Sequence, residues 1–330
     1  MKTVRVIGTG SYLPPRMLSN ETVAQRLHLT DEAIVRRTGI VSRYWADPSQ
    51  TTSDLAFEAA QRALASAGLT PADVGGIIVS TTSPDMPFPS TACQLQRRLG
   101  VRGGAAFDVS ASCSGFLYAA SMALNLLQSG MMRSCLVVAA EIKSRSLNLD
   151  DESTALLFGD GAGAVVLRVD ESATDRPDGI LGIRLFADGS RRDLIRVEAG
   201  GSRHPTTTET LAQGKHTLRM NGAPLFRIAV KRLCEAVSEL LKEFGVTMPE
   251  VAQVVCHQAN GRLLQAIGRR LAVPEGKLFS MIERVGNTSS ASLPIALDTA
   301  VRDGRIRPGD LVVLGAFGGG LTWGTGIVRW

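Results

Sequence analysis

Apolar residues recur at helical spacing in two long segments of this chain, residues 52–67 and 225–244. Each segment is followed by a short polar stretch and then by a run rich in β-branched residues, at 76–80 and at 253–257. A period of 3.6 residues predicts an amphipathic helix, and a short bounded run of this kind predicts a buried strand. The same order of helix and strand therefore occurs twice, which indicates an internal repeat.

The repeat extends to further pairs of segments. These are predicted helices at 92–99 and 262–271, predicted strands at 135–139 and 311–315, turn-and-strand segments at 159–169 and 323–329, and helices that start at Cys113 and near Ser290. Strands that alternate with helices favour an α/β fold with largely parallel, buried sheets. We therefore expect two similar halves packed about a pseudo-twofold axis.

A polar stretch with proline and glycine, residues 170–179, separates the halves. We place the boundary there, which gives an N-terminal half of 1–171 and a C-terminal half of 172–330. In a pseudo-symmetric fold, the helix starts at Cys113 and near Ser290 lie close together beside the axis. The junction of the halves is then the expected place for a ligand cleft.

The composition limits the classes of partner. The 330 residues are 44% hydrophobic and 20% charged, with a net charge of +5, which is typical of a globular protein with a large core. The positive charges form no run like a nucleic-acid-binding tail, so we expect an acidic partner and no nucleic acid. No apolar run approaches the length of a membrane span, and glycine and proline interrupt the first residues before a signal peptide could form.

Five cysteines, at positions 93, 113, 135, 234 and 256, are an odd number without the spacing of disulfide or zinc motifs. We expect them to be reduced, in a cytoplasmic protein without a zinc site. Cys113 differs from the others because it lies between small residues where a predicted strand passes into a helix. The positive end of a helix stabilises a thiolate and lowers the pKa of the thiol. A buried packing thiol is the alternative.

Two other polar residues lie in loops that the repeat brings to the same junction. His257 ends a predicted strand, and the carboxyl ends of strands in α/β sheets are where ligand sites form. Asn287 lies in the segment 286–292, just before the second helix. A capping histidine and a turn asparagine are the alternatives. Together with Cys113, these residues supply a nucleophile, a proton-handling group and a second hydrogen-bond donor.

Two glycine-rich segments have the composition of ligand-binding loops. Residues 159–163 run into an apolar strand at 164–167, whereas a dinucleotide fingerprint requires a helix, so we expect a tight turn. The glycines at 318–320 allow a close approach of the backbone. Both sheet packing and an N–H donor to an oxyanion explain them.

The chain carries, in order, the motifs RTGI at 37–40, FPS at 88–90, ASCSGF at 111–116, FGDGAG at 158–163, HQAN at 257–260, GNTS at 286–289 and FGGGLTWG at 317–324. In these motifs it resembles the thiolase-like condensing enzymes, and most of all the β-ketoacyl-acyl carrier protein synthase III family. The resemblance implies an α/β fold of the thiolase-like five-layered αβαβα type with two pseudo-symmetric halves, in agreement with the repeat.

The resemblance also implies a two-stage reaction that needs no metal or organic cofactor. The Cys113 thiolate takes an acyl group from an acyl-CoA or an acyl-carrier protein. Malonyl-acyl carrier protein then loses carbon dioxide, and the carbanion attacks the acyl-cysteine. His257 and Asn287 would donate hydrogen bonds to the malonyl thioester oxygen as charge develops there. The backbone N–H groups of Cys113 and Gly319 would form the oxyanion hole of the acyl-transfer step.

Binding residues follow from the same resemblance. The implied substrate-binding residues are Arg37, Phe88, Gly222, Phe226, Asn260 and Phe317, and the residues implied to dock acyl carrier protein are Arg227, Arg262, Arg269 and Arg270. Phe88 matches a residue that crosses a homodimer interface to close the partner's acyl pocket, so a homodimer is expected. A basic patch beside the tunnel suits an acidic carrier protein; simple solvation is the alternative for each arginine.

Two positions depart from the family. Members that use acyl-CoA hold its adenine between a tryptophan and an arginine, and Ala33 and Glu152 stand at these places. Trp45 is a nearby candidate replacement. Because a stacking surface and a cation are both missing, we expect an acyl-carrier protein or an unusual CoA thioester to be the preferred donor.

Three other functions compete with condensation. An acyltransferase on the same scaffold would move the acyl group to another acceptor, but Asn287 matches the group used for decarboxylation. The nucleophile Cys113 argues against a non-catalytic partner subunit. A papain-like thiol hydrolase also uses Cys, His and Asn, but its sequence around the cysteine differs and it lacks the duplication.

Overall fold

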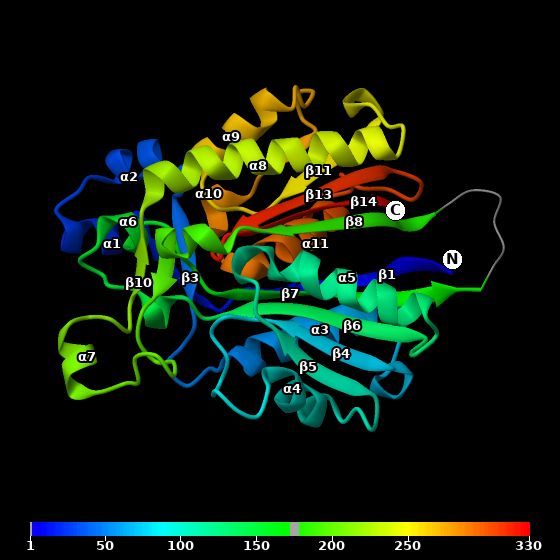
Figure 1. The fold of residues 1–330 in the computed structure, drawn as a ribbon, viewed down its shortest axis with the longest axis horizontal. Helices are drawn as coiled ribbons and strands as arrows, with labels where there is room; N and C mark the ends of the chain where they lie inside the picture. Colours follow the sequence, from blue (N-terminus) through cyan, green and yellow to red (C-terminus); the bar gives the residue numbers. More distant parts are fainter. Residues whose placement is uncertain (1, 172–177) are drawn as a thin grey trace.

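Two mixed β-sheets form the framework of the computed structural model, which describes residues 2–171 and 178–330 (Figure 1). The strand order of the first sheet is β5 (Ala105–Val109), β4 (Gly76–Ser80), β6 (Ser134–Glu141), β7 (Gly161–Asp170) and β1 (Thr3–Tyr12). The order of the second is β12 (Leu278–Phe279), β11 (Gln253–Cys256), β13 (Leu311–Gly318), β14 (Thr322–Arg329) and β8 (Gly179–Ala187). The strands that the repeat pairs, β4 with β11, β6 with β13 and β7 with β14, occupy the same places in the two sheets.

Strand direction differs from the expectation of largely parallel sheets. β4 is parallel to β5 and β6, and β11 is parallel to β12 and β13. By contrast, β7 and β14 are antiparallel to both of their neighbours. Residues 319–321 alone connect β13 to β14, and so short a connection permits only an antiparallel hairpin.

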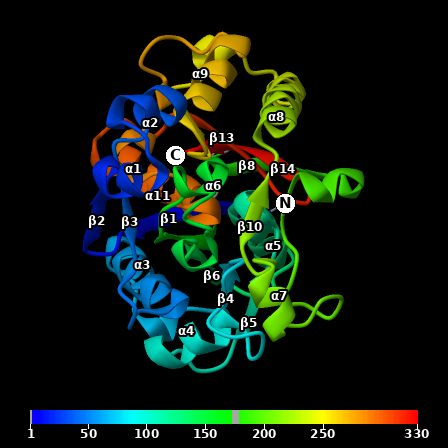
Figure 2. The same cartoon turned by 90° about the vertical axis from the view of Figure 1, so that its left-hand side faces the viewer.

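Helices form the other layers. α3 (Thr52–Ala67) and α4 (Thr91–Leu99) cover the outer face of the first sheet, and α8 (Gly222–Glu243) and α9 (Gly261–Arg270) cover that of the second. α5 (Gly115–Gln128) and α11 (Ser292–Arg302) lie between the sheets (Figure 2). The described residues therefore form the five layers αβαβα that the resemblance implies.

The core lies on both sides of the two central helices. β4 and β6 are buried along their whole lengths, so they read as continuous apolar runs rather than as alternating ones. α5 is apolar on most of its faces because a sheet packs on each side of it. This packing fixes where α5 begins, at the carboxyl ends of the parallel strands.

α3 shows how local signals set an element in place. The Thr51 side chain accepts a hydrogen bond from the Asp54 N–H at the start of the helix, and Gly68 ends it in a left-handed conformation with φ 64°. Small residues on its buried face allow β1 to approach closely. A Cβ atom on Gly10 would lie 2.4 Å from the backbone nitrogen of Ala63, so only glycine fits there.

Shorter elements surround the end of the core where α5 and α11 begin, at the left of Figure 1. They are β2 (Arg16–Ser19), α1 (Asn20–Leu27), α2 (Asp31–Thr38), β3 (Ser42–Trp45), α6 (Glu152–Ala155), β9 (Ile195–Val197), α7 (Thr208–Ala212), β10 (Leu218–Met220) and α10 (Ile282–Val285). Several of them contribute to the wall of the pocket described below.

The predicted boundary between the halves, at 171/172, adjoins residues 172–177, which lie outside the described part of the chain. Before them, β7 is the last strand of the N-terminal half, and after them, β8 is the first strand of the C-terminal half. None of the helices that the structure describes is both long enough and apolar enough to cross a bilayer.

Candidate active site

The two central helices begin side by side. Short 3₁₀ turns precede them, Ser112–Ser114 before α5 and Ser289–Ala291 before α11, and the two turns contact each other. Ser112 and Ser289 both adopt left-handed backbone conformations, with φ 50° and 53°. Residues with a side chain rarely adopt this conformation, and those that do cluster at functional sites. The junction that the repeat predicts is therefore observed.

A pocket of about 720 Å³ opens onto this junction. Cys113, His257 and Asn287 all line it, so the structure brings the three candidate residues together. The wall also contains most of the other predicted positions: Arg37, Gly222, Phe226, Arg227, Asn260, Arg262, Phe317 and Gly319.

Cys113 is buried, with 6% of its surface exposed, and its Sγ lies 3.5 Å from Ser289 Oγ. Burial raises the pKa of the Cys113 thiol, while the hydrogen bond with Ser289 and the positive charge of Lys143 lower it and the negative charge of Glu141 raises it. The expectation of a lowered pKa is wrong in net direction, because loss of water around the thiolate outweighs the favourable groups. The thiol therefore needs a proton acceptor before it can act as a nucleophile.

The end of β13 touches the backbone of Cys113. A Cβ atom on Gly318 would lie 2.6 Å from the Cys113 nitrogen, which is too close for any side chain. Gly319 follows in the pocket wall, and a Cβ there would lie 3.2 Å from Ser112 Oγ. Close packing thus explains Gly318, and the role of the Gly319 N–H as an oxyanion donor stays a prediction.

His257 directly follows β11 and is 4% exposed. Its backbone N–H donates to the Gly315 carbonyl on the neighbouring strand, at 2.7 Å. Its ring Nδ1 is hydrogen-bonded with the hydroxyl of Ser292, which also accepts from the Gln258 N–H at 3.1 Å. A Ser292 hydroxyl that donates its own proton to Nδ1 places the histidine proton on Nε2, where it can serve as a donor.

The His257 ring is expected to show no titration between pH 5 and 8. Burial lowers the pKa of His257 to about 3, so the ring is neutral throughout this range. Nitrogen NMR on histidine-labelled protein, with His257→Ala to assign the signal, measures this directly. The unfolded chain is the control, because there the same ring titrates near its ordinary pKa of about 6.5. A titration midpoint near pH 6 for the folded protein would contradict the prediction.

Asn287 is 5% exposed and is held between two loops. Its backbone N–H donates to the Leu157 carbonyl at 2.8 Å, and its own carbonyl accepts from the Gly159 N–H at 3.0 Å. Its side-chain oxygen accepts from the Ser289 N–H at 2.8 Å, and its Nδ2 donates to the Ala259 carbonyl at 3.3 Å. Because an amide nitrogen carries two hydrogens, one is left for a ligand in the pocket.

The glycine-rich segment 159–163 lies beside Asn287 and helps to hold it in place. Phe158 forms a bridge with Asn287, and the segment leads directly into β7. Gly159 and Asp160 form a short irregular connection, and residues 161–163 are the start of β7 rather than the expected tight turn. A strand and not a helix follows, as expected, so the segment lacks the helix that a dinucleotide fingerprint requires. Across the described residues, no group of three or more His, Cys, Asp or Glu side chains is placed to hold a metal ion.

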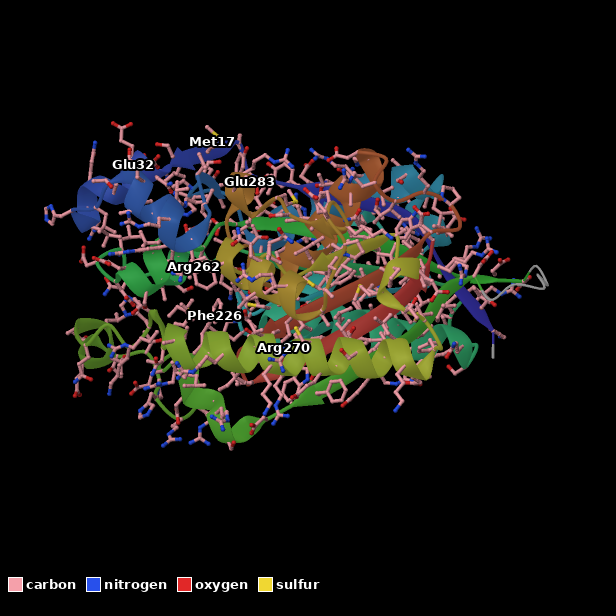
Figure 3. All side chains as sticks on the ribbon, turned by 90° about the horizontal axis from the view of Figure 1, so that it is seen from above. Met17, Glu32, Phe226, Arg262, Arg270 and Glu283 are labelled. Carbon is pink, nitrogen blue, oxygen red and sulfur yellow. The ribbon has the colours of Figure 1, made fainter. Side chains whose placement is uncertain are left out.

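Phe88 and two of the predicted docking arginines lie outside the pocket wall. Phe88 is 86% exposed, and Arg269 and Arg270 are exposed on α9. Arg227 and Arg262 are exposed as well, but they line the pocket. Figure 3 looks onto this face of the molecule and shows Arg262 and Arg270 on it. The four arginines therefore extend from the pocket along the outer helices.

Two residues of the pocket wall form an ion pair that the sequence analysis did not predict. Arg37 and Glu152 approach to 2.6 Å, and both side chains are about half exposed. The predicted substrate-binding Arg37 thus already has an acidic partner. Trp45 is engaged elsewhere, because its indole N–H donates to the Phe158 carbonyl at 3.2 Å.

Sequence patterns also missed the apolar wall and the polar groups behind Cys113. The apolar lining comes from Leu156, Leu157, Phe158, Ile195, Met220, Leu225, Ala229, Leu233 and Leu263. Glu141 and Lys143 lie at the end of β6, and an acidic residue that closes an apolar strand was the signal that could have identified them.

Comparison with known proteins agrees with this geometry. A family model described as 3-oxoacyl-[acyl-carrier-protein (ACP)] synthase III matches residues 107–189. A second model, described as the C-terminal part of the same synthase, matches residues 241–330. A β-ketoacyl-[acyl-carrier-protein] synthase III of Erythrobacter litoralis is 49% identical over 98% of each chain. The crystal structure of 3-oxoacyl-[acyl-carrier-protein] synthase III from Aquifex aeolicus has a TM-score of 0.90 at 40% identity, covering 99% of this chain and 100% of that one.

The priming β-ketosynthase from the R1128 polyketide biosynthetic pathway is similar too, with a TM-score of 0.91 at 35% identity over 99% of this chain and 96% of that one. These similarities extend over the whole chain and are consistent with the repeat, the layers and the pocket. The chain belongs to the β-ketoacyl-[acyl-carrier-protein] synthase III family.

Proposed function

We propose that the protein catalyses the decarboxylating Claisen condensation of an acyl thioester primer with malonyl-acyl carrier protein, giving a 3-oxoacyl-acyl carrier protein. The observation that carries the proposal is the meeting of three buried residues, Cys113, His257 and Asn287, in one pocket of a chain in this family. Each residue type matches one requirement of the reaction: a nucleophile, and two donors for the developing enolate.

In the first stage, Cys113 Sγ attacks the thioester carbonyl of the primer. The new Sγ–C bond forms as the bond to the donor's sulfur breaks, and the donor leaves as a thiol. Backbone N–H groups of Cys113 and Gly319 hydrogen-bond the oxygen while it carries negative charge. The apolar wall of the pocket supplies the surroundings that an acyl chain and its linker require.

In the second stage, malonyl-acyl carrier protein takes the place of the donor. Its carbon–carbon bond to the carboxylate breaks, carbon dioxide leaves, and the electron pair passes to the thioester as an enolate. The Nε2–H of neutral His257 and one amide N–H of Asn287 stabilise the enolate oxygen. The enolate carbon then attacks the acyl-cysteine and frees the Cys113 thiolate. The malonyl thioester itself acidifies the adjacent carbon, so we propose no metal and no organic cofactor.

The test is the release of carbon dioxide from malonyl-acyl carrier protein in the presence of an acyl donor, with product identified by mass spectrometry. Condensation gives one carbon dioxide for each 3-oxoacyl product. An acyltransferase would instead move the acyl group without release of carbon dioxide, and that outcome would overturn the proposal.

We propose that an acyl-carrier protein, or an unusual CoA thioester, is preferred as donor over an ordinary acyl-CoA. Glu152 stands where a cation would face the nucleotide, and it neutralises Arg37 across 2.6 Å. Ala33 offers no ring for adenine to stack on. Loss of an aromatic and cation pair weakens binding by about 1.4 kcal/mol, which is about tenfold in affinity.

Acylation of Cys113 is therefore expected to be at least about tenfold more efficient with an acyl-carrier protein than with the same acyl group on CoA. The double variant Ala33→Trp with Glu152→Arg should recover efficiency with acyl-CoA and leave the carrier-protein donor unchanged. Glu239→Arg is the control, since it makes the same charge change at an exposed position of α8 away from the pocket. A micromolar Michaelis constant of the native protein for acetyl-CoA, with no gain from carrier protein, would contradict the prediction.

We further propose acyl carrier protein as the docking partner, a homodimer as the assembly and the cytoplasm as the compartment. The exposed arginines 227, 262, 269 and 270 suit an acidic partner. The exposed Phe88 ring and the unpaired edge of β5 support a contact between two copies. All five cysteines are free, which fits a reducing compartment.

A further inference from the structure

Glu141 is a buried charge that the two-stage reaction does not use. It ends β6, an otherwise apolar strand, and is 0% exposed. Its Oε2 lies 3.2 Å from Lys143 Nζ, whose side chain is 10% exposed. A charged pair is costly to bury unless further hydrogen bonds satisfy it. The surroundings of Glu141 therefore indicate what keeps it in place.

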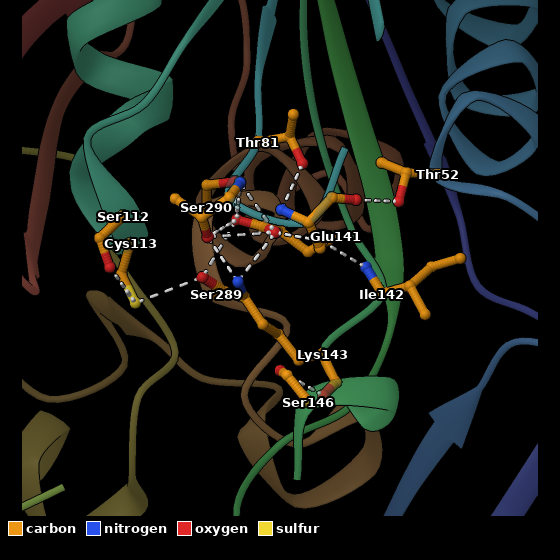
Figure 4. Close-up of polar contacts among 12 residues, drawn as sticks. Thr52, Thr81, Ser112, Cys113, Glu141, Ile142, Lys143, Ser146, Ser289 and Ser290 are labelled. Carbon is orange, nitrogen blue, oxygen red and sulfur yellow. Dashed lines mark hydrogen bonds and ion pairs between the residues drawn. The ribbon is translucent and has the colours of Figure 1, made fainter. Parts of the chain in front are cut away.

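Hydroxyl groups from two directions surround the carboxylate (Figure 4). From the loop after β4, Ser83 Oγ donates to Oε2 at 2.6 Å, and Thr82 donates through its backbone N–H and its hydroxyl. From the turn before α11, Ser290 Oγ donates to Oε1 at 2.9 Å and Ser289 Oγ donates to Oε1 at 3.3 Å. Lys143 also donates to the Thr82 hydroxyl. Lys143 thus pairs with Oε2, whereas Ser289 and Ser290 both donate hydrogen bonds to Oε1.

Ser289 connects this carboxylate to the nucleophile. Its Oγ lies 3.5 Å from Cys113 Sγ on one side and 3.3 Å from Glu141 Oε1 on the other. Its backbone is fixed with φ 53°, and its N–H donates to Asn287 Oδ1. A serine hydroxyl has one proton and two lone pairs, so when it donates to the carboxylate it can accept from the thiol. In this arrangement the Cys113 S–H donates a hydrogen bond to Ser289 Oγ, and the Ser289 O–H donates a hydrogen bond to the Glu141 carboxylate.

Among the described residues, the other groups near Cys113 are less suited to accept its proton. The Ser112 hydroxyl lies 3.9 Å from Sγ and is the donor of that contact. His257 lines the same pocket as Cys113, but burial lowers its pKa to about 3 and its Nδ1 already bonds with Ser292. Lys143 is a cation paired with Glu141 and has no lone pair to offer while charged. Because burial raises the pKa of the Cys113 thiol, the acylation step requires an acceptor.

We propose that Ser289 relays the Cys113 thiol proton to Glu141 during acylation, a role that rests on the proposed condensation and deepens it. As the bond from Sγ to the acyl carbon forms, the thiol proton passes to Ser289 Oγ and the serine proton passes to Glu141. As the donor's carbon–sulfur bond breaks, the protons return along the same path to the leaving sulfur. The donor departs as a thiol, and Glu141 is a carboxylate again. Glu141 and Lys143 act through Ser289 and are positioning residues.

A purely electrostatic role for Glu141 predicts the opposite effect. The carboxylate's charge opposes ionisation of Cys113, whereas the charge of Lys143 favours it. Glu141→Gln removes the first charge and leaves the second unopposed. If charge alone mattered, the thiol of this variant would ionise more readily and react faster. The relay predicts that it reacts more slowly.

The experiment compares Glu141→Gln and Ser289→Ala with Ser290→Ala in the full-length protein. Ser290 bonds to the same carboxylate oxygen, but it has no contact with Cys113 sulfur among those the structure gives, so its variant is the matched control. Two rates are measured: acylation of Cys113 by the acyl donor, and alkylation of Cys113 by iodoacetamide as a function of pH.

Both relay variants should acylate at least about 100-fold more slowly at pH 7, since general acid–base catalysis contributes about this factor. The alkylation profile of Ser289→Ala should shift to higher pH, because the Ser289 hydrogen bond lowers the Cys113 pKa, whereas that of Glu141→Gln should shift to lower pH, because the opposing charge is gone. Slow acylation by Glu141→Gln in spite of a more readily ionised thiol is the signature of the relay, and Glu141→Asp should recover part of the acylation rate. Ser290→Ala should stay close to the native protein. Ser289→Ala leaves the ion pair of Glu141 and Lys143 intact, so it tests the relay even if Glu141→Gln does not fold.

Acylation by Glu141→Gln at or above the native rate would overturn the relay, as would equal losses in Ser289→Ala and Ser290→Ala. Failure of the proposed condensation gives a different pattern. In that case the native protein would form no acyl-cysteine with any donor, while the iodoacetamide profiles would still report on the path from Cys113 to Glu141.

Discussion

Replacing Cys113 with alanine is expected to reduce acyl transfer to the background rate. The reaction passes through a covalent acyl-cysteine, and alanine offers no atom to carry the acyl group. The other buried thiols cannot substitute, because burial raises the pKa of Cys135 and Cys256 to about 12 and that of Cys234 to about 11. These thiols stay protonated at neutral pH and none of them lines the pocket in the described structure.

Mass spectrometry after brief exposure to an acyl donor gives the direct measurement. The native protein should carry the adduct on the peptide that contains Cys113, and Cys113→Ala should carry none. Cys93→Ala is the matched control, since Cys93 is exposed on α4 and is the most accessible thiol. It should keep full activity. An adduct on any of the other four cysteines would refute the assignment.

The duplicated architecture was readable from the sequence because it depends on local patterns. The periodicities of α3 and α8, and the β-branched runs of β4 and β11, each reflect burial that one segment undergoes by itself. Strand direction was not readable in the same way. A strand buried on both faces has the same composition whichever way it runs, so the composition of β7 gave no sign that it is antiparallel to its neighbours. For β14, the short connection from β13 was the signal that could have shown its direction.

The positions of Cys113, His257 and Asn287 followed from the repeat and the family motifs, but their surroundings did not. Arg37 and Glu152 are 115 residues apart, and Glu141 and Ser289 are 148 apart. Only the folded arrangement brings such pairs into contact. The same limit explains the error over the Cys113 pKa. A helix start is visible in the sequence, whereas the depth of burial that opposes it is set by two sheets packing around the site.

His257→Ala and Asn287→Ala are each expected to slow decarboxylation of malonyl-acyl carrier protein far more than they slow acylation of Cys113. Each removes one of the two hydrogen-bond donors to the enolate oxygen. Loss of one such donor costs about 3 kcal/mol of transition-state stabilisation, or roughly a hundredfold or more in rate. Acylation depends on the thiol, its proton acceptor and the backbone donors, so it should fall much less.

The two stages are separated by measuring carbon dioxide release and acyl-cysteine formation in the same preparation. Asn287 needs a second variant, because its Oδ1 also accepts from the Ser289 N–H at 2.8 Å. Asn287→Asp keeps that acceptor oxygen and removes the amide N–H donors, so it should acylate better than Asn287→Ala yet decarboxylate no faster. For His257, neutrality near pH 7 means that the loss should be the same at pH 6 and pH 8. If either alanine variant releases carbon dioxide at the native rate, the enolate is stabilised by other groups and the assigned roles are wrong.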